Sequence, residues 1–225
     1  LSFQFNQAET ASILATAHRQ AVTVNDLLAR DLFLALEDFR LRQRIGKETD
    51  WLRLTIPMNL RADWAQNLPA ANAVSMVFLD RQRSDCDDPM RLLHGIHEEM
   101  DLIKRHQLGF TFLLSLKTRR SLPGGLARAM QKNSECMATS VLTNLGRPFA
   151  NSLLPRQDGK IVAGDVVLEA VEGVVPLRPH TCAGFALTTY AGQLNIVLHY
   201  DSRVLAQNQA EDLLNTYVGF VRNAI

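Results

Sequence analysis

Two short runs near the end of the chain constrain its fold most. Residues 185–190 and 194–200 are strand-like and are separated by the turn Ala191-Gly192, so they predict an antiparallel hairpin. Further strands are expected at residues 1–5, 51–57, 73–79, 137–143 and 161–170. Because strands and helices are mixed along the chain and at least one hairpin is present, we expect an α/β two-layer sandwich. In such a fold a mixed β-sheet is packed with helices, unlike a doubly wound parallel sheet.

Helical spacing of apolar residues occurs between these strands. Helices are expected at residues 8–20, 24–44, 89–106 and 110–117, in a short segment that ends near residue 131, and from residue 207 onward. Thr23 can cap the second helix by accepting the backbone N–H three residues on, and Asp26 places an acidic group in its first turn. The apolar stripe of this helix is wide, so we expect burial on more than one side.

Charge and cysteine usage argue against several classes of protein. The 24 Lys and Arg residues nearly balance 23 Asp and Glu, a net charge of +1, so nucleic acid is a disfavoured partner. No stretch approaches the roughly 18 apolar residues of a membrane span. The three cysteines, Cys86, Cys136 and Cys182, are widely spaced and odd in number, which favours a reducing, cytoplasmic location. No linker or repeat interrupts the chain, so residues 1–225 are expected to form a single domain.

Two clusters of titratable residues are candidate sites, each with a simpler structural explanation. His94, His97, Glu98 and Asp101 lie near one face of a predicted helix, and we expect a solvated polar face there rather than a metal site. A basic cluster surrounds the Pro-Gly-Gly break at 123–125. It could hold a phosphate of coenzyme A or of a phosphopantetheine arm, or be a solvated surface, and consists of Lys117, Arg119, Arg120, Arg128 and Lys132.

The sequence contains no nucleophile elbow, Walker loop or dinucleotide fingerprint. His199, in the predicted hairpin, is expected to pack or hydrogen-bond across the strand pair. No set of base, acid and nucleophile stands out, and no cofactor is indicated. Composition, periodicity and spacing therefore lead only to an α/β domain.

Four segments, in this order, resemble the C-terminal half of one superfamily: Val-Thr-Val-Asn-Asp-Leu-Leu at 22–28, Ile-Pro-Met-Asn-Leu-Arg at 56–61, Ala-Asn-Ala-Val-Ser at 71–75, and Thr-Asn-Leu-Gly at 143–146. That superfamily contains the chloramphenicol acetyltransferases, peptide-synthetase condensation domains, alcohol acetyltransferases and wax-ester or diacylglycerol synthases. The wax-ester synthase and alcohol acetyltransferase branches look nearest. The resemblance covers almost the whole chain and implies a chloramphenicol acetyltransferase-like half-domain.

The resemblance also implies a division of labour between two halves. The family's catalytic motif, His-His-x-x-x-Asp-Gly, belongs to the N-terminal half and is missing from this sequence. The chain is therefore expected to be the second half only, as an excised fragment or a naturally separate half, and to be inactive alone. Its partners would be the N-terminal half and an acyl-CoA or acyl-carrier protein, whose thioester is attacked by a hydroxyl or amine.

Within this half, the resemblance points to Thr143 and Asn144 as the residues that face the acyl group or its oxyanion. Asn25 and Asp26 could line the cleft, but a helix cap explains them equally well. Arg61 could hold its loop to the sheet or meet a phosphate.

A second hypothesis, from a different class, is a non-catalytic half-domain that serves as a carrier-protein docking or assembly module. In either case, removal of one half of a buried interface leaves an apolar surface. We therefore expect that surface to be exposed or masked by self-association.

Overall fold

A six-stranded mixed sheet organises the protein. The computed structural model describes residues 1–47, 50–60, 73–121, 138–178 and 180–225. The strand order is β1-β9-β8-β4-β2-β3, in which β8–β4 and β4–β2 are parallel and the other pairs antiparallel. The strands are β1 (Ser2–Gln4), β2 (Leu52–Asn59), β3 (Val74–Arg81), β4 (Ser140–Asn144), β8 (Ala183–Tyr190) and β9 (Gln193–Tyr200). The predicted mixed α/β class and the predicted hairpin, β8–β9, are both confirmed.

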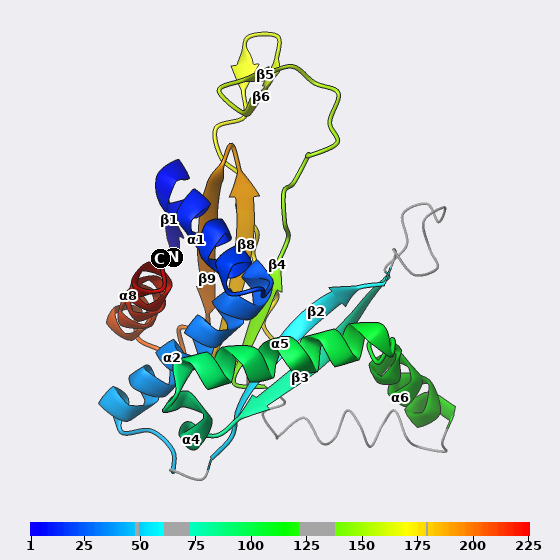
Figure 1. Ribbon diagram of the computed structural model, residues 1–225, viewed down its shortest axis with the longest axis vertical. Helices are drawn as coiled ribbons and strands as arrows, with labels where there is room; N and C mark the ends of the chain where they lie inside the picture. The colour runs from blue at the N-terminus through cyan, green and yellow to red at the C-terminus, as the bar shows by residue number, and fades with distance from the viewer. Residues whose placement is uncertain (48–49, 61–72, 122–137, 179) are drawn as a thin grey trace.

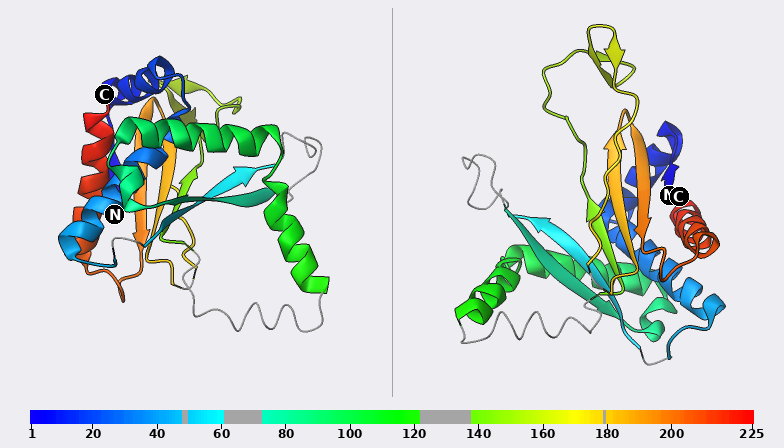
Figure 2. Two further views of the ribbon diagram at one scale, coloured as in Figure 1. Left: turned by 60° about the horizontal axis from the view of Figure 1, so that its bottom comes forward. Right: turned by 180° about the vertical axis from the view of Figure 1, so that it is seen from behind.

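The helices gather mainly on one face of this sheet, as the view from behind shows (Figure 1; Figure 2, right). They are α1 (Gln7–Arg19), α2 (Val24–Gln43), α4 (Arg83–Cys86), α5 (Pro89–Arg105), α6 (Phe110–Ser121) and α8 (Gln207–Asn223). Alternate strand residues such as Phe185, Ile196 and Leu142 point into the core between the sheet and these helices. None of the helices in the described part of the chain is long and apolar enough to cross a membrane.

Helix α2 lies at the centre of this core and is buried on almost every side, as its wide apolar stripe predicted. Thr23 caps it as expected: its hydroxyl accepts from the Asp26 N–H at 3.3 Å, and the Asp26 carboxylate accepts from the Thr23 N–H at 2.9 Å. From the far side, the Tyr217 hydroxyl on α8 donates to the Leu28 carbonyl at 3.0 Å. The helix is thus held at its first turn and along its length.

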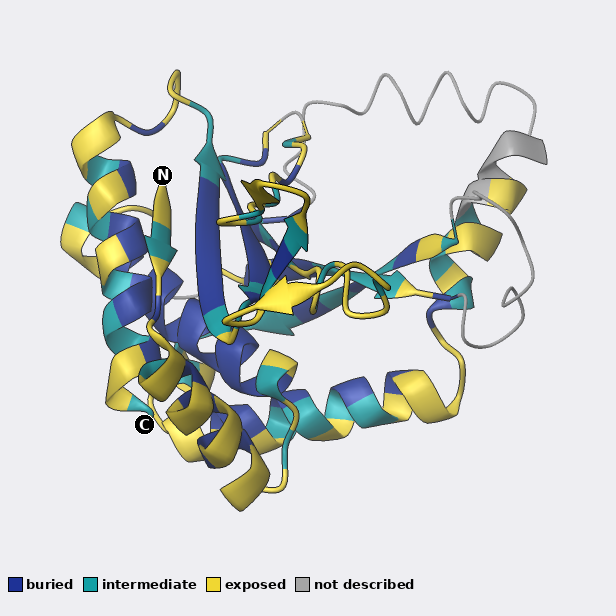
Figure 3. Ribbon diagram, turned by 90° about the horizontal axis from the view of Figure 1, so that it is seen from above, coloured by how far each residue is buried: buried dark blue, intermediate teal, exposed yellow. Residues whose placement is uncertain are grey.

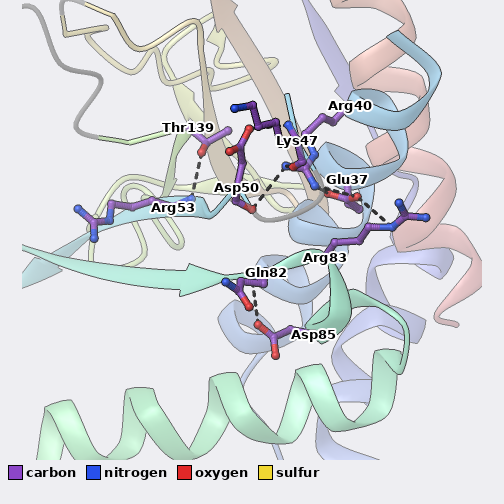
Figure 4. Close-up of polar contacts among 9 residues, drawn as sticks. All are labelled: Glu37, Arg40, Lys47, Asp50, Arg53, Gln82, Arg83, Asp85 and Thr139. Atoms are coloured by element: carbon purple, nitrogen blue, oxygen red, sulfur yellow. Dashed lines mark hydrogen bonds and ion pairs between the residues drawn. The ribbon is translucent and has the colours of Figure 1, made fainter. Parts of the chain in front are cut away.

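Four charged residues of α2 are buried as two ion pairs within the helix. Arg30 donates to Asp31 at 2.8 Å, and Arg40 lies 2.9 Å from Glu37. Arg40 also donates to the Lys47 carbonyl at 3.0 Å, which ties the end of α2 to the chain that leads into β2 (Figure 4). If one member of a pair were removed, the other would be left as an isolated charge in the core, at a cost of several kcal/mol. The two residues of each pair therefore depend on each other.

The sheet face that carries few helices is partly covered by residues 171–177, here called the strap. The Thr188 hydroxyl donates to the Val171 carbonyl at 2.9 Å, and Val175 packs against Ala186 and Val197. A side chain at Gly173 would overlap Leu145, so glycine permits this close passage.

The strand predicted at residues 161–170 is wrong. Residues 147–170 form instead an arm with three short strands, β5 (Arg156–Gln157), β6 (Lys160–Ala163) and β7 (Val166–Val167). The chain reverses between β6 and β7, where Gly164 has φ +64°, a conformation that glycine adopts readily. The arm projects beyond the β8–β9 turn and is largely exposed (Figures 1 and 3).

Asp31 makes the stability of the fold depend on pH. Burial raises the pKa of Asp31 to about 7, against the lowering effect of Arg30. The folded protein therefore holds a proton that the unfolded chain loses near pH 3.8. The stability that this proton provides is fully present below about pH 3.8 and is lost as the pH rises to about 7, by at most about 1.4 kcal/mol per pH unit.

We expect urea denaturation across this range to show the free energy of unfolding of the wild type falling relative to Asp31→Asn, which has no such proton. Asp38→Asn, an exposed carboxylate on the same helix, is the control and should keep a constant difference from the wild type. A difference between wild type and Asp31→Asn that does not vary with pH would contradict the assignment.

Candidate functional site

The end of β4 meets the start of α2, and this junction brings together two residues that the sequence singled out. The Asn144 Nδ2 donates to the Asn25 Oδ1 at 2.6 Å, although the residues are 119 positions apart. Strand β4 ends here, where Gly146 has φ +68°, although Leu145 and Gly146 still hydrogen-bond β8 through their backbones. Both asparagines are exposed. We call this contact the Asn25–Asn144 junction.

The orientation of the Asn144 amide is fixed by its second hydrogen bond. Its Oδ1 accepts from the Gly146 N–H at 2.8 Å, so the NH₂ group must face Asn25. Since an amide nitrogen carries two hydrogens, one N–H of Asn144 and both of Asn25 are left to donate elsewhere, as judged from the described residues. The junction can therefore present neutral hydrogen-bond donors to a developing negative charge.

Thr143 precedes this junction on the sheet face opposite α2. It stands beside Ala186 in the register of β4 and β8, whereas its neighbour Leu142 points into the helical core. Thr143 is half-buried. Thr143 and Asn144 are thus at the same end of β4, but their side chains point to opposite faces of the sheet.

Asp26 contacts His97, a residue expected from the sequence to lie on a solvated surface. Asp26 is only 1% exposed, and its Oδ2 lies 2.8 Å from the Nδ1 of His97 on α5. Its Oδ1 is buried with no partner among the described residues. Asp26 thus serves as a helix cap, which is the structural one of the two roles expected from the sequence. It also joins α2 to α5.

The expectation of a solvated polar face is correct for His94 and Glu98, which are exposed, but wrong for His97. The spacing of His97 from buried residues of α5 does indicate that it faces the core. His97 is four residues after Leu93 and three before Met100, both buried, so it falls within the apolar stripe of α5. No group of three metal-ligating residues is found in the part of the chain that the structure describes.

The basic cluster cannot be assembled from the described residues. Lys117 is exposed on α6. The side chains of Arg119 and Arg120 lie outside what the structure describes, as do Arg61, Arg128 and Lys132. The phosphate-binding role expected for this cluster stays a prediction.

Cys86 is not a nucleophile at neutral pH. Burial, followed by the nearby carboxylates of Glu37, Asp85 and Asp87, raises the pKa of its thiol to about 12. The thiolate, which is the reactive form, is therefore almost absent.

Comparison with known proteins identifies similar chains. The family model of the WS/DGAT C-terminal domain matches residues 70–215. No curated protein sequence matches the chain. Among solved structures, the wax ester synthase/diacylglycerol acyltransferase from Marinobacter aquaeolei VT8 is similar over 99% of this chain and 48% of its own, with a TM-score of 0.60 and 18% identity.

Two further structures are similar over the whole of this chain. The trichothecene 15-O-acetyltransferase from Fusarium sporotrichioides has a TM-score of 0.67 and 13% identity, with 46% of its chain covered. An epimerization domain of tyrocidine synthetase B has a TM-score of 0.64 and 15% identity, with 47% covered. This chain thus spans less than half the length of each of these three proteins. The likeness confirms the fold expected from the resemblance.

The double contact of Asp26 has a measurable consequence for stability. Asp26→Ala removes both the cap and the partner of His97, and we expect the free energy of unfolding to fall by about 2 kcal/mol. Glu9→Ala is the matched control, since Glu9 occupies the same capping-box position in α1 but is half-buried and pairs with the largely exposed Arg222 instead of a histidine. It should cost no more than about 1 kcal/mol. Equal losses in denaturant unfolding would show that the contact with His97 contributes nothing.

Proposed function

Since this chain belongs to the family of the WS/DGAT C-terminal domain, we propose that it is the C-terminal half of an acyltransferase. The enzyme would transfer an acyl group from a coenzyme A or carrier-protein thioester to a hydroxyl or amine. Two structures similar to this chain are named for acyl transfer, a wax ester synthase/diacylglycerol acyltransferase and a 15-O-acetyltransferase. The single observation in this chain that carries the proposal is the Asn25–Asn144 junction.

In the proposed reaction, a base from the N-terminal half takes the proton of the acceptor hydroxyl or amine, and the acceptor attacks the thioester carbonyl. The carbonyl oxygen becomes a tetrahedral oxyanion. As the intermediate collapses, the C–S bond breaks and the thiolate leaves with the proton held by the base. This half of the protein supplies no proton; its task is to stabilise the oxyanion and to form one wall of the site.

The junction is suited to that task because its donors are already oriented. Asn144 is held by Gly146 and Asn25, so an N–H aimed at the oxyanion would need no reorganisation when charge develops. Asp26 and His97 act one step away, since they fix the turn of α2 that carries Asn25. Thr143 points to the opposite face of the sheet, so it stays a candidate for the wall of the substrate tunnel and not for the donor pair of the junction.

The arm supports the proposal of an N-terminal partner half. Phe149, Leu153 and Val166 are more than half exposed, and Leu153 is wholly so. Exposed side chains of this size, gathered on an arm that stands away from the sheet, favour a surface that is covered in the assembled protein. The same observation favours the second candidate function, a half-domain that docks a carrier protein or assembles with another copy.

We expect the isolated chain to self-associate through this arm. The double variant Phe149→Ser and Leu153→Ser should shift size-exclusion light scattering towards the monomer and reduce apolar dye binding, because it removes the exposed apolar surface. Ile45→Ser is the control, an exposed apolar residue beyond the end of α2. A wild-type chain that stays monomeric on concentration and binds no dye would argue against an interface on the arm.

The isolated chain should release no thiol from acyl-coenzyme A with alcohol or amine acceptors, because the motif His-His-x-x-x-Asp-Gly is missing from its sequence. The assay is free-thiol detection, with the parent protein that carries both halves as the positive control. Release above background that is lost in His180→Ala or His199→Ala would mean that the chain is a complete enzyme.

In the parent protein, Asn144→Ala should lower kcat by about 10²-fold with little change in KM, as loss of one oxyanion donor does. Asn208→Ala, an exposed asparagine on α8, is the matched control. A variant that raises KM alone would assign Asn144 to substrate binding instead.

A further inference from the structure

A second candidate site lies where β9 ends and β8 begins. A cavity of about 770 Å³ opens there between the hairpin and the end of the strap. We call it the β9 cavity. Four of its lining side chains are basic: Arg178, His180, His199 and Arg203.

Asp201 is the one carboxylate among the described residues that line the β9 cavity, and it is already neutralised. Asp201 accepts from the Arg203 Nε at 2.9 Å and from its Nη2 at 2.7 Å. These side-chain hydrogen bonds, with a further one from the Arg203 backbone, lower the pKa of Asp201 to about 2. Because Asp201 and Arg203 satisfy each other, no other described residue in the cavity lining offsets the charge of Arg178.

His199 is held so that one ring nitrogen is available to a ligand. Its Nδ1 lies 2.6 Å from the Val175 carbonyl oxygen, which belongs to the buried part of the strap. A carbonyl only accepts, so Nδ1 carries the hydrogen and donates. The expected bond across the strand pair is thus replaced by a bond to the strap. Nε2 has no protein partner among the described residues, so it remains for a ligand in the cavity.

We propose that the β9 cavity binds a phosphate group, either inorganic phosphate or a phosphate monoester. Arg178 donates to the phosphate oxygens with its planar guanidinium, and the Nε2 of His199 accepts from a phosphate hydroxyl or, when the ring is protonated, donates to a phosphate oxygen. Thr181 and Ser202 add hydroxyl groups to the lining, while Leu177 and Val204 give an apolar side on which the rest of a monoester can lie.

This site is separate from the Asn25–Asn144 junction. Asn144 pairs with Leu187 in the sheet, whereas the cavity adjoins Ala183, roughly 13 Å away along β8. Phosphate binding here requires neither the N-terminal half nor acyl transfer. The proposal therefore stands or falls independently of the proposed function.

The test uses the full chain labelled with ¹⁵N-histidine. Inorganic phosphate is added while imidazole ¹H–¹⁵N spectra are recorded at constant pH and ionic strength. We expect a saturable shift of the His199 Nε2 signal. Arg178→Gln should weaken binding by at least about tenfold, the effect of losing about 1.4 kcal/mol. Arg105→Gln, an exposed arginine on α5, is the control and should bind phosphate as the wild type does.

A second variant tests the contribution of the His199 ring to binding while keeping the bond that holds it to the strap. His199→Asn retains a side-chain N–H for the Val175 carbonyl but removes Nε2, so it should fold and bind phosphate more weakly. Parallel titrations with pantetheine 4′-phosphate distinguish the sources, since tighter binding of the monoester identifies a phosphorylated arm and equal binding identifies the free anion. A shift that does not saturate, or that is unchanged in Arg178→Gln, would overturn the proposal.

Discussion

The burial of α2 is the constraint on which the rest of the structure depends. A helix enclosed on almost every side must satisfy each polar group that it takes into the core, because water does not reach it. Arg30 with Asp31 and Arg40 with Glu37 meet most of this requirement within the helix, and Tyr217 adds a hydroxyl from α8. One oxygen each of Asp26, Asp31 and Glu37 has no hydrogen-bond partner among the described residues. The sheet, α5 and α8 are arranged around this helix, so its position fixes theirs (Figure 3).

The candidate site follows from where α2 begins. Its first turn must be capped, and Thr23 with Asp26 supplies the cap from within the sequence. Because that turn is packed against α5, Asp26 also meets His97, and Asn25 is left facing the end of β4. A local rule of helix formation therefore places a polar residue beside Asn144. The function proposed for the junction uses donors that the fold has oriented for a structural reason.

The strap and the arm show how one segment can serve two surfaces. Residues 171–177 lie on the sheet, where Gly173 allows close contact with Leu145 next to the junction and Val175 holds the ring of His199. The preceding residues leave the sheet and form the arm, whose apolar side chains are exposed. The strap thus borders both candidate sites, and the arm that precedes it provides the proposed interface.

The sequence by itself determined the local elements. Apolar periodicity, the Thr23 cap and the Ala191-Gly192 turn were sufficient to locate α1, α2, α5, α8 and the β8–β9 hairpin, because each depends on neighbours a few residues away. Only the tertiary structure decided which distant residues meet. The contact of Asn25 with Asn144 joins residues 119 positions apart, and that of His97 with Asp26 joins residues 71 positions apart. No short window of sequence contains either pair, because chain topology rather than local preference sets these distances.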